Sequence, residues 1–372
     1  MKSSTTVYIL IGIIVVLAAV IIGILLYLNS QPEPVRGIEP LVEIEPMEPD
    51  PEVWGVNYPN QWSTLQKTET NNDRTAYGGS EPFSKLEVDP RLVTLFAGYG
   101  FSKEYNEDRG HMNSLTDVEG TTRVGEKTPG TCYSCKSSDN PRLWDEMGME
   151  EYDMTPFMEL GNEIDHAIGC ANCHDPDSME LIVTNPALDE ALQAQGQDWR
   201  DFTRQEMRTV VCANCHVEYY FKGDGKYLTF PWEDGTRIED IATYYAELGF
   251  NDWEHPQSGA PMIKMQHPEY ELFTQNSTHF DAGVACADCH MPYTRDGAAK
   301  FSTHNVKSPL LNAENACGQC HTDVTYVTNR VSTIQNQVSE TMIATEDALL
   351  AAISAIESAA ALSGVDSQLL DE

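Results

Sequence analysis

The sequence predicts a mainly α-helical, loop-rich fold that is preceded by one N-terminal membrane-spanning helix and ends in a long helix. Three features indicate this. Residues 7–28 form a charge-free apolar run, and apolar residues after residue 326 recur at helical spacing. Between them, Gly, Pro, Asn and Asp interrupt the sequence often, and no long stretch alternates apolar and polar residues as a strand would. The 372 residues include 23 Lys+Arg and 58 Asp+Glu, so the net charge is −35. This acidity excludes nucleic acid as a partner, because phosphate binding needs clustered positive charge.

Residues 7–28 are expected to anchor the chain in a membrane. A helix of this length reaches roughly 33 Å, against a hydrocarbon core of about 30 Å. A cleaved secretory signal is the alternative, but its apolar region is about 7–15 residues long and ends in a small-x-small site, which this run lacks. Lys2 precedes the run and acidic residues follow it, which keeps the N-terminus inside. The rest of the chain is then exported, to the periplasmic side of a bacterial cytoplasmic membrane.

Composition divides the exported part into three segments. Residues 29–53 are expected to form an extended tether, because six prolines and six acidic residues crowd residues 31–51. Residues 54–325 are expected to form the main domain, built from short helices and ordered loops. Residues 326–372 are expected to begin a long amphipathic helical region, whose apolar face packs on this domain or on a partner.

All ten cysteines fall into five Cys-x-x-Cys pairs, and four pairs are followed at once by histidine. Cys-x-x-Cys-His is the attachment motif of c-type haem: two thiols bind the two vinyl groups of one porphyrin, and the next residue lies under the iron as axial ligand. The motifs are Cys132/Cys135 followed by Lys136, Cys170/Cys173 by His174, Cys212/Cys215 by His216, Cys286/Cys289 by His290, and Cys317/Cys320 by His321.

Zinc and thiol redox chemistry fit these cysteines poorly. A zinc ribbon pairs two Cys-x-x-Cys knuckles about 15–20 residues apart, whereas successive pairs here begin 31 to 74 residues apart. A thioredoxin-like site needs one such motif beside a βαβ unit, not five. We therefore expect five covalently bound c-type haems in residues 54–325, filling much of the interior of that domain. This agrees with export, because thioether attachment takes place on the outer face of the bacterial membrane.

The first motif differs from the others because Lys136 stands where histidine is expected. A pure electron conduit would give every iron two histidines. A lysine amine ligates only when it is deprotonated, and metal binding lowers its pKa enough to allow this. A degenerate motif that binds no haem is the alternative on these residues alone.

In the order of its four Cys-x-x-Cys-His motifs and one Cys-x-x-Cys-Lys, the chain resembles the cytochrome c nitrite reductases of the cytochrome c-552 family. These are pentahaem, ammonia-forming enzymes of nitrate respiration. The resemblance runs from about residue 54 to residue 344 and covers further motifs. These are Cys-Ala-Asn-Cys-His-Val-Glu-Tyr-Tyr-Phe at 212–221, Pro-Met-Ile-Lys-Met-Gln-His-Pro-Glu-Tyr-Glu at 261–271, and Arg109-Gly110-His111 followed by Thr116-Asp117-Val118 and Arg123-Val124-Gly125.

The resemblance implies an active site at the first motif. Lys136 would be the proximal ligand of the catalytic haem, and Arg123, Tyr219 and His267 would line its open distal side. Arg123 offers a permanent positive charge to nitrite oxygens, and His267 can donate protons near neutral pH. Reduction of nitrite to ammonium takes six electrons, which explains four electron-feeding haems beside one catalytic haem.

The resemblance also implies one calcium ion and three distal haem ligands. Glu218 and Gln266 would bind Ca²⁺ through side-chain oxygens, and Tyr219 and Lys264 through backbone carbonyls, a set that suits a hard cation. Calcium would hold Tyr219 and His267 in place. The distal ligands would be His111, His279 and His304, for the haems bound by His216, His321 and His174 respectively.

The chain departs from the family at three places. Tyr133 stands where the family commonly has Trp, and His166 and His255 match no functional position and are expected to be ordinary surface or loop residues. No histidine follows His321, although the family ligates the haem of His290 from its C-terminal helices. We therefore expect a longer full protein, whose continuing helix supplies that histidine and completes a dimer interface, leaving residues 331–338 partly exposed here.

Nitrite is thus the expected substrate, and a membrane quinol-oxidising multihaem cytochrome the expected electron donor. Two alternatives remain. A pentahaem electron-transfer protein would lack an Arg and a His over an open iron, whereas a relative that reduces hydroxylamine or sulfite would use the same pocket. Kinetics with nitrite against sulfite would separate the two enzymes.

Overall fold

The computed structural model describes residues 14, 16–17, 20–21 and 40–362, and two compact units divide the chain, Met1–Leu41 and Val42–Glu372. The predicted anchor at 7–28 lies almost entirely outside the described residues. Among those described, no helix has the length and apolar character needed to cross a membrane. The second unit holds all five attachment motifs.

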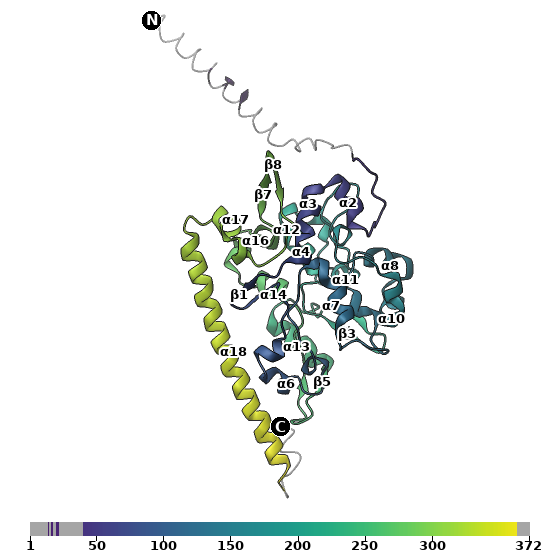
Figure 1. Ribbon diagram of the computed structural model, residues 1–372, viewed down its shortest axis with the longest axis vertical. Helices are drawn as coiled ribbons and strands as arrows, with labels where there is room; N and C mark the ends of the chain where they lie inside the picture. Colours follow the sequence, from purple (N-terminus) through teal and green to yellow (C-terminus); the bar gives the residue numbers. More distant parts are fainter. Residues whose placement is uncertain (1–13, 15, 18–19, 22–39, 363–372) are drawn as a thin grey trace, which may run out of the picture. The chain divides into compact units, whose positions relative to one another are not determined.

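The second unit is mainly helical, as predicted, and most of its helices are short (Figure 1). The α-helices are α2 (Pro51–Asn57), α3 (Pro59–Leu65), α4 (Lys67–Thr70), α5 (Lys85–Val88), α6 (Arg91–Leu95), α7 (Ser114–Gly120), α8 (Asn140–Met147), α9 (Met149–Met154), α10 (Phe157–Leu160), α11 (Pro186–Ala194), α12 (Arg204–Val210), α13 (Ile238–Leu248), α14 (Glu269–Thr274), α15 (Thr278–Asp281), α16 (Cys286–His290), α17 (Ala313–Ala316) and α18 (Val324–Ala360).

Single 3₁₀ turns and small hairpins connect these helices. The 3₁₀ turns are η1 (Gly100–Ser102), η2 (His111–Asn113), η3 (Gly130–Tyr133), η4 (Gly161–Glu163), η5 (Cys170–Asn172), η6 (Trp199–Asp201), η7 (Val211–Asn214), η8 (Pro309–Asn312) and η9 (Cys317–Gln319). The strands pair antiparallel in four two-stranded hairpins, β1 (Arg74–Thr75) with β2 (Gly78–Gly79), β3 (Tyr220–Lys222) with β4 (Tyr227–Thr229), β5 (Trp253–Glu254) with β6 (Pro261–Met262), and β7 (Tyr293–Asp296) with β8 (Ala299–Ser302).

Local sequence sets several helix boundaries. Asp50 caps α2 by accepting the backbone N–H of Glu52 at 2.8 Å, and Pro51 occupies the first turn, where its missing N–H is harmless. Thr203 and Glu206 form a reciprocal capping box at the start of α12. Gly249 ends α13 in the left-handed conformation with φ 63°, which glycine adopts without a Cβ clash.

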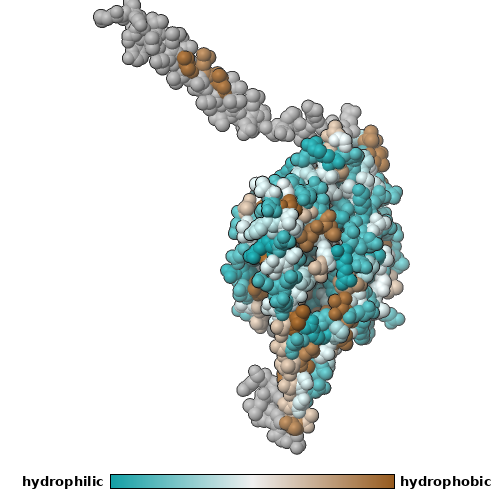
Figure 2. All heavy atoms as spheres, turned by 60° about the vertical axis from the view of Figure 1, so that its left-hand side comes forward, coloured by the Kyte–Doolittle hydropathy of each residue, from teal (hydrophilic) through white to brown (hydrophobic). Residues whose placement is uncertain are grey.

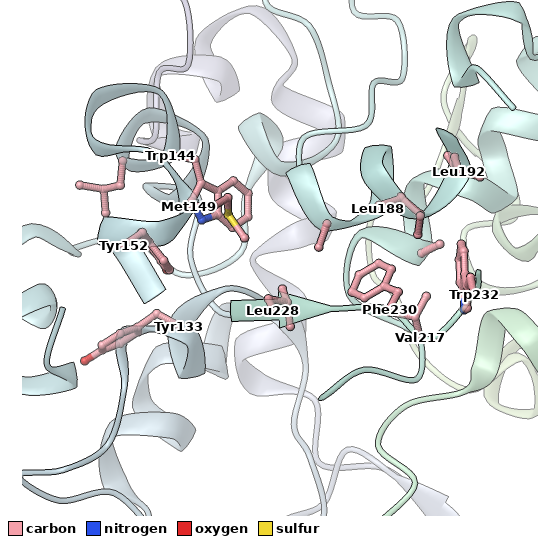
Figure 3. Close-up of a cluster of buried hydrophobic side chains, with 14 of the residues drawn as sticks. Tyr133, Trp144, Met149, Tyr152, Leu188, Leu192, Val217, Leu228, Phe230 and Trp232 are labelled. Atoms are coloured by element: carbon pink, nitrogen blue, oxygen red, sulfur yellow. The ribbon is translucent and has the colours of Figure 1, made fainter. Parts of the chain in front are cut away.

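The main hydrophobic core includes Tyr133 of the first motif and Ala213 of the third. Figure 3 shows Phe230 and Trp232, which follow β4, near Leu188 of α11 and Val217, which directly follows the third motif. Trp232, Leu188 and Val217 are fully buried. The core therefore packs directly against the segment that carries His216.

Leu188→Ala is expected to lower the free energy of unfolding by about 2–5 kcal/mol, because it removes buried methyl groups and leaves a cavity. Leu272→Ala is the matched control, since Leu272 is 68% exposed, and it should change stability by less than about 0.5 kcal/mol. Chemical denaturation of haem-loaded protein, followed by far-UV circular dichroism, measures both. Equal stability of the two variants would contradict this description of the core.

The end of the predicted tether belongs to the folded unit. Residues 42–53 lie in the second unit, where Ile44 is buried beside Trp54, and the Trp54 indole N–H donates to the Glu48 carbonyl at 2.9 Å. The apolar residues between the prolines explain this difference, because burying them on the domain offsets the extended character of the segment.

Helix α18 confirms the long C-terminal helix and runs along one side of the second unit (Figure 1). Arg91 of α6 holds it by ion pairs to Glu346 at 3.0 Å and Asp347 at 3.2 Å. Val331 is half-buried, whereas Ile334 and Val338 are exposed. In Figure 2 apolar atoms follow the lower part of this helix. Packing on its own domain therefore covers only part of the apolar stripe.

Candidate haem sites and active site

Each attachment motif is organised by one short helical turn. In the second, third and fifth motifs the histidine N–H donates to the carbonyl of the first cysteine, at 3.0, 2.9 and 2.9 Å respectively. This turn brings both thiols and the following side chain to one side of the backbone. The described part of the chain contains no disulfide, and all ten cysteines are free thiols.

The fifth motif lies at the edge of the second unit. Cys320 is exposed, whereas the other nine cysteines are half-buried, and the adjacent His321 is exposed as well. The reason is the position of the motif in the fold. Its turn η9 packs mainly against α17 and the start of α18, away from the main core. Cys320 stays a predicted attachment point, at the surface of the unit rather than inside it.

Within the described residues, four pairs of imidazole rings lie at the spacing of two ligands on one metal: the three pairs that the resemblance implies, and His216 with His267 at 6.5 Å. Two metal–nitrogen bonds of about 2 Å, with roughly 1.2 Å from each nitrogen to its ring centre, separate two ring centres by about 6.4 Å. The structure pairs the rings as the resemblance implies, and the spacing fits an iron between them, while the ligand roles stay predictions. The centroid distances are 6.4 Å for His111 and His216, 6.3 Å for His174 and His304, and 6.2 Å for His279 and His321.

Burial favours the metal-binding form of these imidazoles. It lowers the pKa of His111 and of His304 to about 4 and also lowers the pKa of His174. These rings are therefore neutral at pH 7, which is the state that binds a metal.

Backbone carbonyls select the tautomer of three histidines. In each of these histidines Nδ1 lies close to a backbone carbonyl oxygen. The distances are 2.9 Å for His174, 3.0 Å for His304 and 3.1 Å for His290. A proton on Nδ1 satisfies each contact and leaves Nε2 free for a metal. The chain is thus arranged to present Nε2.

Neighbouring motifs meet through their thiols. The Cys215 thiol of the third motif lies next to Cys135 of the first, and Cys212 of the third lies next to Cys286 of the fourth. Electrostatic interactions also join the second motif to the third and the fourth to the fifth. These sulfurs are the expected porphyrin attachment points, so neighbouring porphyrins bound there would lie close together.

The first motif is held rigidly on both sides. The Lys136 N–H donates to the Tyr133 carbonyl at 2.9 Å, and the Lys136 carbonyl accepts from the Ser114 hydroxyl at 2.6 Å. Tyr133 stacks on Phe157 with ring centres 4.0 Å apart. Tyr133 therefore serves as a buried packing residue, a role in which it can replace the more usual Trp.

Two expected pocket residues converge on this motif. Burial raises the pKa of the Cys132 thiol to about 11, while the nearby positive charges of Arg123 and Lys136 lower it. Burial likewise raises the pKa of Tyr219, which interacts electrostatically with Cys135 and Cys132. Arg123, Tyr219 and Lys136 thus all lie near the thiols of the first motif.

Arg123 is oriented by two neighbours. Its Nε donates to the Thr121 hydroxyl at 3.1 Å, and its guanidinium carbon lies 4.1 Å from the centre of the Phe101 ring. The Lys264 ammonium lies 4.5 Å from the same ring centre. A cation–π contact of this kind is worth about 0.5–2 kcal/mol and restrains the side chain.

The motif around His111 is fixed by an ion pair and a close backbone approach. Arg109 donates to Asp117 at 2.8 Å. A Cβ on Gly110 would lie 2.4 Å from the Thr68 carbonyl oxygen, so only glycine fits there. These contacts explain why the Arg-Gly-His and Thr-Asp-Val segments occur together.

The expected calcium region contains a buried carboxyl. Glu218 is fully buried and accepts from the Tyr245 hydroxyl at 2.9 Å and from the Gln266 N–H at 2.6 Å. Burial raises its pKa to about 7. The Lys264 ammonium donates to the Gln266 side-chain oxygen at 3.3 Å, which is the oxygen that the resemblance assigns to calcium.

Glu271 adds a second buried carboxyl beside Glu218. Its Oε1 accepts from the Glu218 N–H at 2.9 Å and from the Trp232 indole at 2.8 Å, whereas its buried Oε2 has no hydrogen-bond partner. Burial raises the Glu271 pKa to about 7 as well. Two adjacent buried carboxyls favour a nearby cation, and oxygen donors fit Ca²⁺.

Among the described residues, no three His, Cys, Asp or Glu side chains are clustered so that they could hold a metal ion. The expected calcium set contains only one such side chain, Glu218, so the calcium expectation is not affected.

His267 lies close to the third motif, and its predicted place in the pocket of the first motif stays a prediction. Its Nδ1 lies 3.8 Å from Glu269 Oε1, and its ring centre is 6.5 Å from that of His216. In the described part of the chain no hydrogen bond or ion pair joins His267 to Arg123 or Tyr219.

No histidine ring is paired with His290 within the described residues, and its second ligand stays a prediction. His166 is engaged elsewhere, with Nδ1 3.2 Å from Asp139. His255 was expected at the surface or in a loop. It lies in a loop but is only 1% exposed, with Nε2 2.8 Å from the Thr94 carbonyl, because it packs where β5 ends against the aromatic cluster that contains Trp253.

The sequence argument missed the supporting residues of the site. Phe101, Thr121 and Glu269 contact the expected pocket residues Arg123 and His267, but they belong to no chemical motif. Only Glu269 lies within a quoted family segment, at 261–271, and its position two residues after His267 is the one signal that could have identified it.

Comparison with known proteins gives one consistent result. The cytochrome c552 family matches residues 50–371. Cytochrome c-552 of Parabacteroides distasonis is 46% identical over 292 residues, which cover 76% of this chain and 59% of that protein. The protein of the same name from Bacteroides fragilis is 46% identical over 287 residues, covering 75% of this chain and 58% of that protein. The chain thus spans less than two thirds of the length of these relatives.

Among solved structures, cytochrome c nitrite reductase from Desulfovibrio desulfuricans matches with a TM-score of 0.81 and 34% identity. The match covers 87% of this chain and 75% of that one. That structure is described as a catalytic subunit with two calcium sites.

Proposed function

The chain belongs to the cytochrome c552 family, and we propose that it is an exported nitrite reductase that converts nitrite to ammonium. The observation that carries this proposal is the contrast between its motifs. Three motif histidines have a second imidazole at ligand spacing, whereas Lys136 has Arg123 and Tyr219 nearby instead. This contrast supports three relay sites and one site open to a small anion.

Five c-type haems, when bound, would supply the electron path and the iron at which the N–O bonds are cleaved. The chain's own residues would do the rest. Lys136 would present a deprotonated amine from the rigid turn after Cys135. The Arg123 guanidinium, restrained by Thr121 and Phe101, would bind the nitrite oxygens by charge-assisted hydrogen bonds.

His267 would donate protons, because an imidazole titrates near neutral pH, and Tyr219 would donate a hydrogen bond from the same pocket. Reduction of one nitrite to ammonium and two waters consumes six electrons and eight protons. A repeated proton donor beside the anion site is therefore as necessary as the electron relay.

We also infer one calcium ion bound by the side chains of Glu218 and Gln266 and by the carbonyls of Tyr219 and Lys264. The buried carboxyls of Glu218 and Glu271 support it. Its position would fix Tyr219, which directly follows Glu218, and His267, which directly follows Gln266.

Glu218→Gln is expected to lower the calcium content of the haem-loaded protein and to reduce nitrite turnover about 10–100-fold, the usual effect of disturbing a residue that supports a metal site. Glu247→Gln, at an exposed position of α13, is the matched control. Elemental analysis and turnover measure both. If both variants keep equal calcium and equal activity, calcium binding at Glu218 is ruled out.

The proposed setting is the periplasmic face of the cytoplasmic membrane, with residues 7–28 as anchor and a quinol-oxidising multihaem cytochrome as electron donor. We further propose a homodimer through the C-terminal helices. Val338 and Met342 line a shallow groove on α18, and their exposure supports such a contact.

The test of the proposed activity compares nitrite, hydroxylamine and sulfite as substrates of the full haem-loaded chain, with a reduced viologen as donor. The highest kcat/KM is expected for nitrite. A clear preference for sulfite or hydroxylamine would favour the related reductases instead. Reduction of the haems by the donor, without loss of any of the three substrates, would favour a protein that only transfers electrons.

A further inference from the structure

Glu269 stands between two histidines that serve different parts of the proposed reaction. Its Oε2 lies 3.8 Å from Nδ1 of His216, and its Oε1 lies 3.8 Å from Nδ1 of His267. Each carboxylate oxygen thus faces a different ring, and the ring planes meet at 78°. One side chain therefore spans the third motif and the expected substrate pocket.

The backbone around Glu269 keeps it in this position. The Glu269 N–H donates to the His267 carbonyl at 2.8 Å, and the Tyr270 N–H donates to the His216 carbonyl at 3.0 Å. Tyr270 also stacks on the buried Trp232, with ring centres 5.2 Å apart. Both histidines are thus tied to the first turn of α14, so the carboxylate is preorganised between them.

The partner of His216 differs in charge from the partners of comparable histidines. Nδ1 of His174, His290 and His304 each faces a neutral backbone carbonyl. His216 faces a carboxylate instead. A negative charge at Nδ1 makes an imidazole a stronger electron donor to its metal and stabilises the oxidised iron.

We propose that Glu269 is a positioning residue that couples the third-motif haem to the substrate pocket, by holding Nδ1 of His216 and Nδ1 of His267 at once. This inference rests on the proposed function, which makes His216 an iron ligand and His267 a proton donor. A carboxylate oxygen 3.8 Å from each Nδ1 would leave Nε2 of His216 for iron and Nε2 of His267 for substrate. Because one carboxylate serves both rings, a change of charge at the iron alters how firmly His267 is held.

The test uses Glu269→Gln in the full haem-loaded chain, with Glu239→Gln as control. Glu239 is 69% exposed at its side chain and pairs only with Arg237 among the described residues, so this control removes the same charge far from either histidine. The first readout is the midpoint potential of each haem in an EPR-monitored redox titration. The ring planes of the three histidine pairs meet at 36°, 48° and 88°, and these different angles give the low-spin irons distinguishable signals.

In Glu269→Gln the potential of the 48° pair, His111 and His216, is expected to become more positive, while the other potentials and the control stay unchanged. Nitrite kcat is expected to fall about 10–100-fold with little change in KM, as for other residues that orient a ligand. An unchanged potential would overturn the coupling to His216, and an unchanged kcat would overturn the coupling to His267. The potential is measured without substrate, so it tests the His216 contact even if nitrite is not reduced.

Glu269→Asp separates the effect of the negative charge from the effect of side-chain length. It also replaces Glu269→Gln as the test variant if Glu269→Gln binds fewer haems. Aspartate keeps the negative charge but is one methylene shorter, so it cannot span both rings. We expect a lowered kcat with a nearly normal potential. Wild-type turnover in Glu269→Asp would overturn the proposal, because a side chain that cannot bridge the two rings would then suffice.

Discussion

Lys136→Ala is expected to reduce nitrite turnover by more than about 100-fold. Loss of a residue that only supports a metal ligand already costs about 10–100-fold, and Lys136 is expected to be the ligand itself. Lys136 is the residue of the first motif that is expected in the axial position, and no histidine ring of the described residues is paired with that motif. Haem retention is expected to fall from five to four per chain, because the first porphyrin loses its axial ligand.

Lys127→Ala is the matched control, since Lys127 is exposed in the loop that precedes the motif, and it should keep normal haem content and rate. Lys136→His should retain the haem but change the rate, because an imidazole donates differently to iron than an amine does. Haem quantitation and turnover measure all three variants. Unimpaired nitrite reduction by Lys136→Ala would refute the assignment of the active site.

Arg123→Leu and His267→Asn are expected to impair different kinetic constants. Loss of the guanidinium removes the cation that binds nitrite, so KM should rise, whereas loss of the imidazole removes a proton donor and should lower kcat by about 10²–10⁴-fold. The haem spectrum should stay near normal in both, because neither side chain is an expected iron ligand.

Arg200→Leu is the control for Arg123, because Arg200 is an exposed arginine whose ion pairs lie outside the site. Its kinetics should match those of the unmodified protein. Steady-state turnover over a range of nitrite concentrations separates the two effects. If nitrite turnover survives when Arg123→Leu and His267→Asn are combined, the substrate pocket lies elsewhere in the chain.

The haem motifs and the main helical character could be predicted from the sequence because both depend on local patterns. A Cys-x-x-Cys-His turn is complete within five residues, and the stripe of α18 repeats every three or four residues. The pairing of His174 with His304 joins distant segments, so it could be expected only from the resemblance to a known family.

The supporting residues could not be predicted, because their role arises from packing. Ile44 lies in a Pro- and Glu-rich segment, yet it is buried beside Trp54. His255 carries no sequence signal for burial, yet it is enclosed beneath the aromatic cluster. Cys320 has the same motif spacing as the half-buried cysteines, yet it is exposed because its turn leads directly into α18.

Glu269 is the clearest case of a role that only the fold creates. It becomes recognisable when His216 and His267, which are far apart in the sequence, are seen on either side of its carboxylate.

The central claim is that this chain reduces nitrite fully to ammonium, and the most direct test is the product balance of the full haem-loaded protein. Nitrite, ammonium and oxidised viologen are measured in the same anaerobic reaction. We expect one ammonium for each nitrite consumed and six electrons withdrawn from the donor, with no nitric oxide or hydroxylamine accumulating. Nitrite that is not consumed, or that is converted mainly to a partly reduced nitrogen product, would contradict the account.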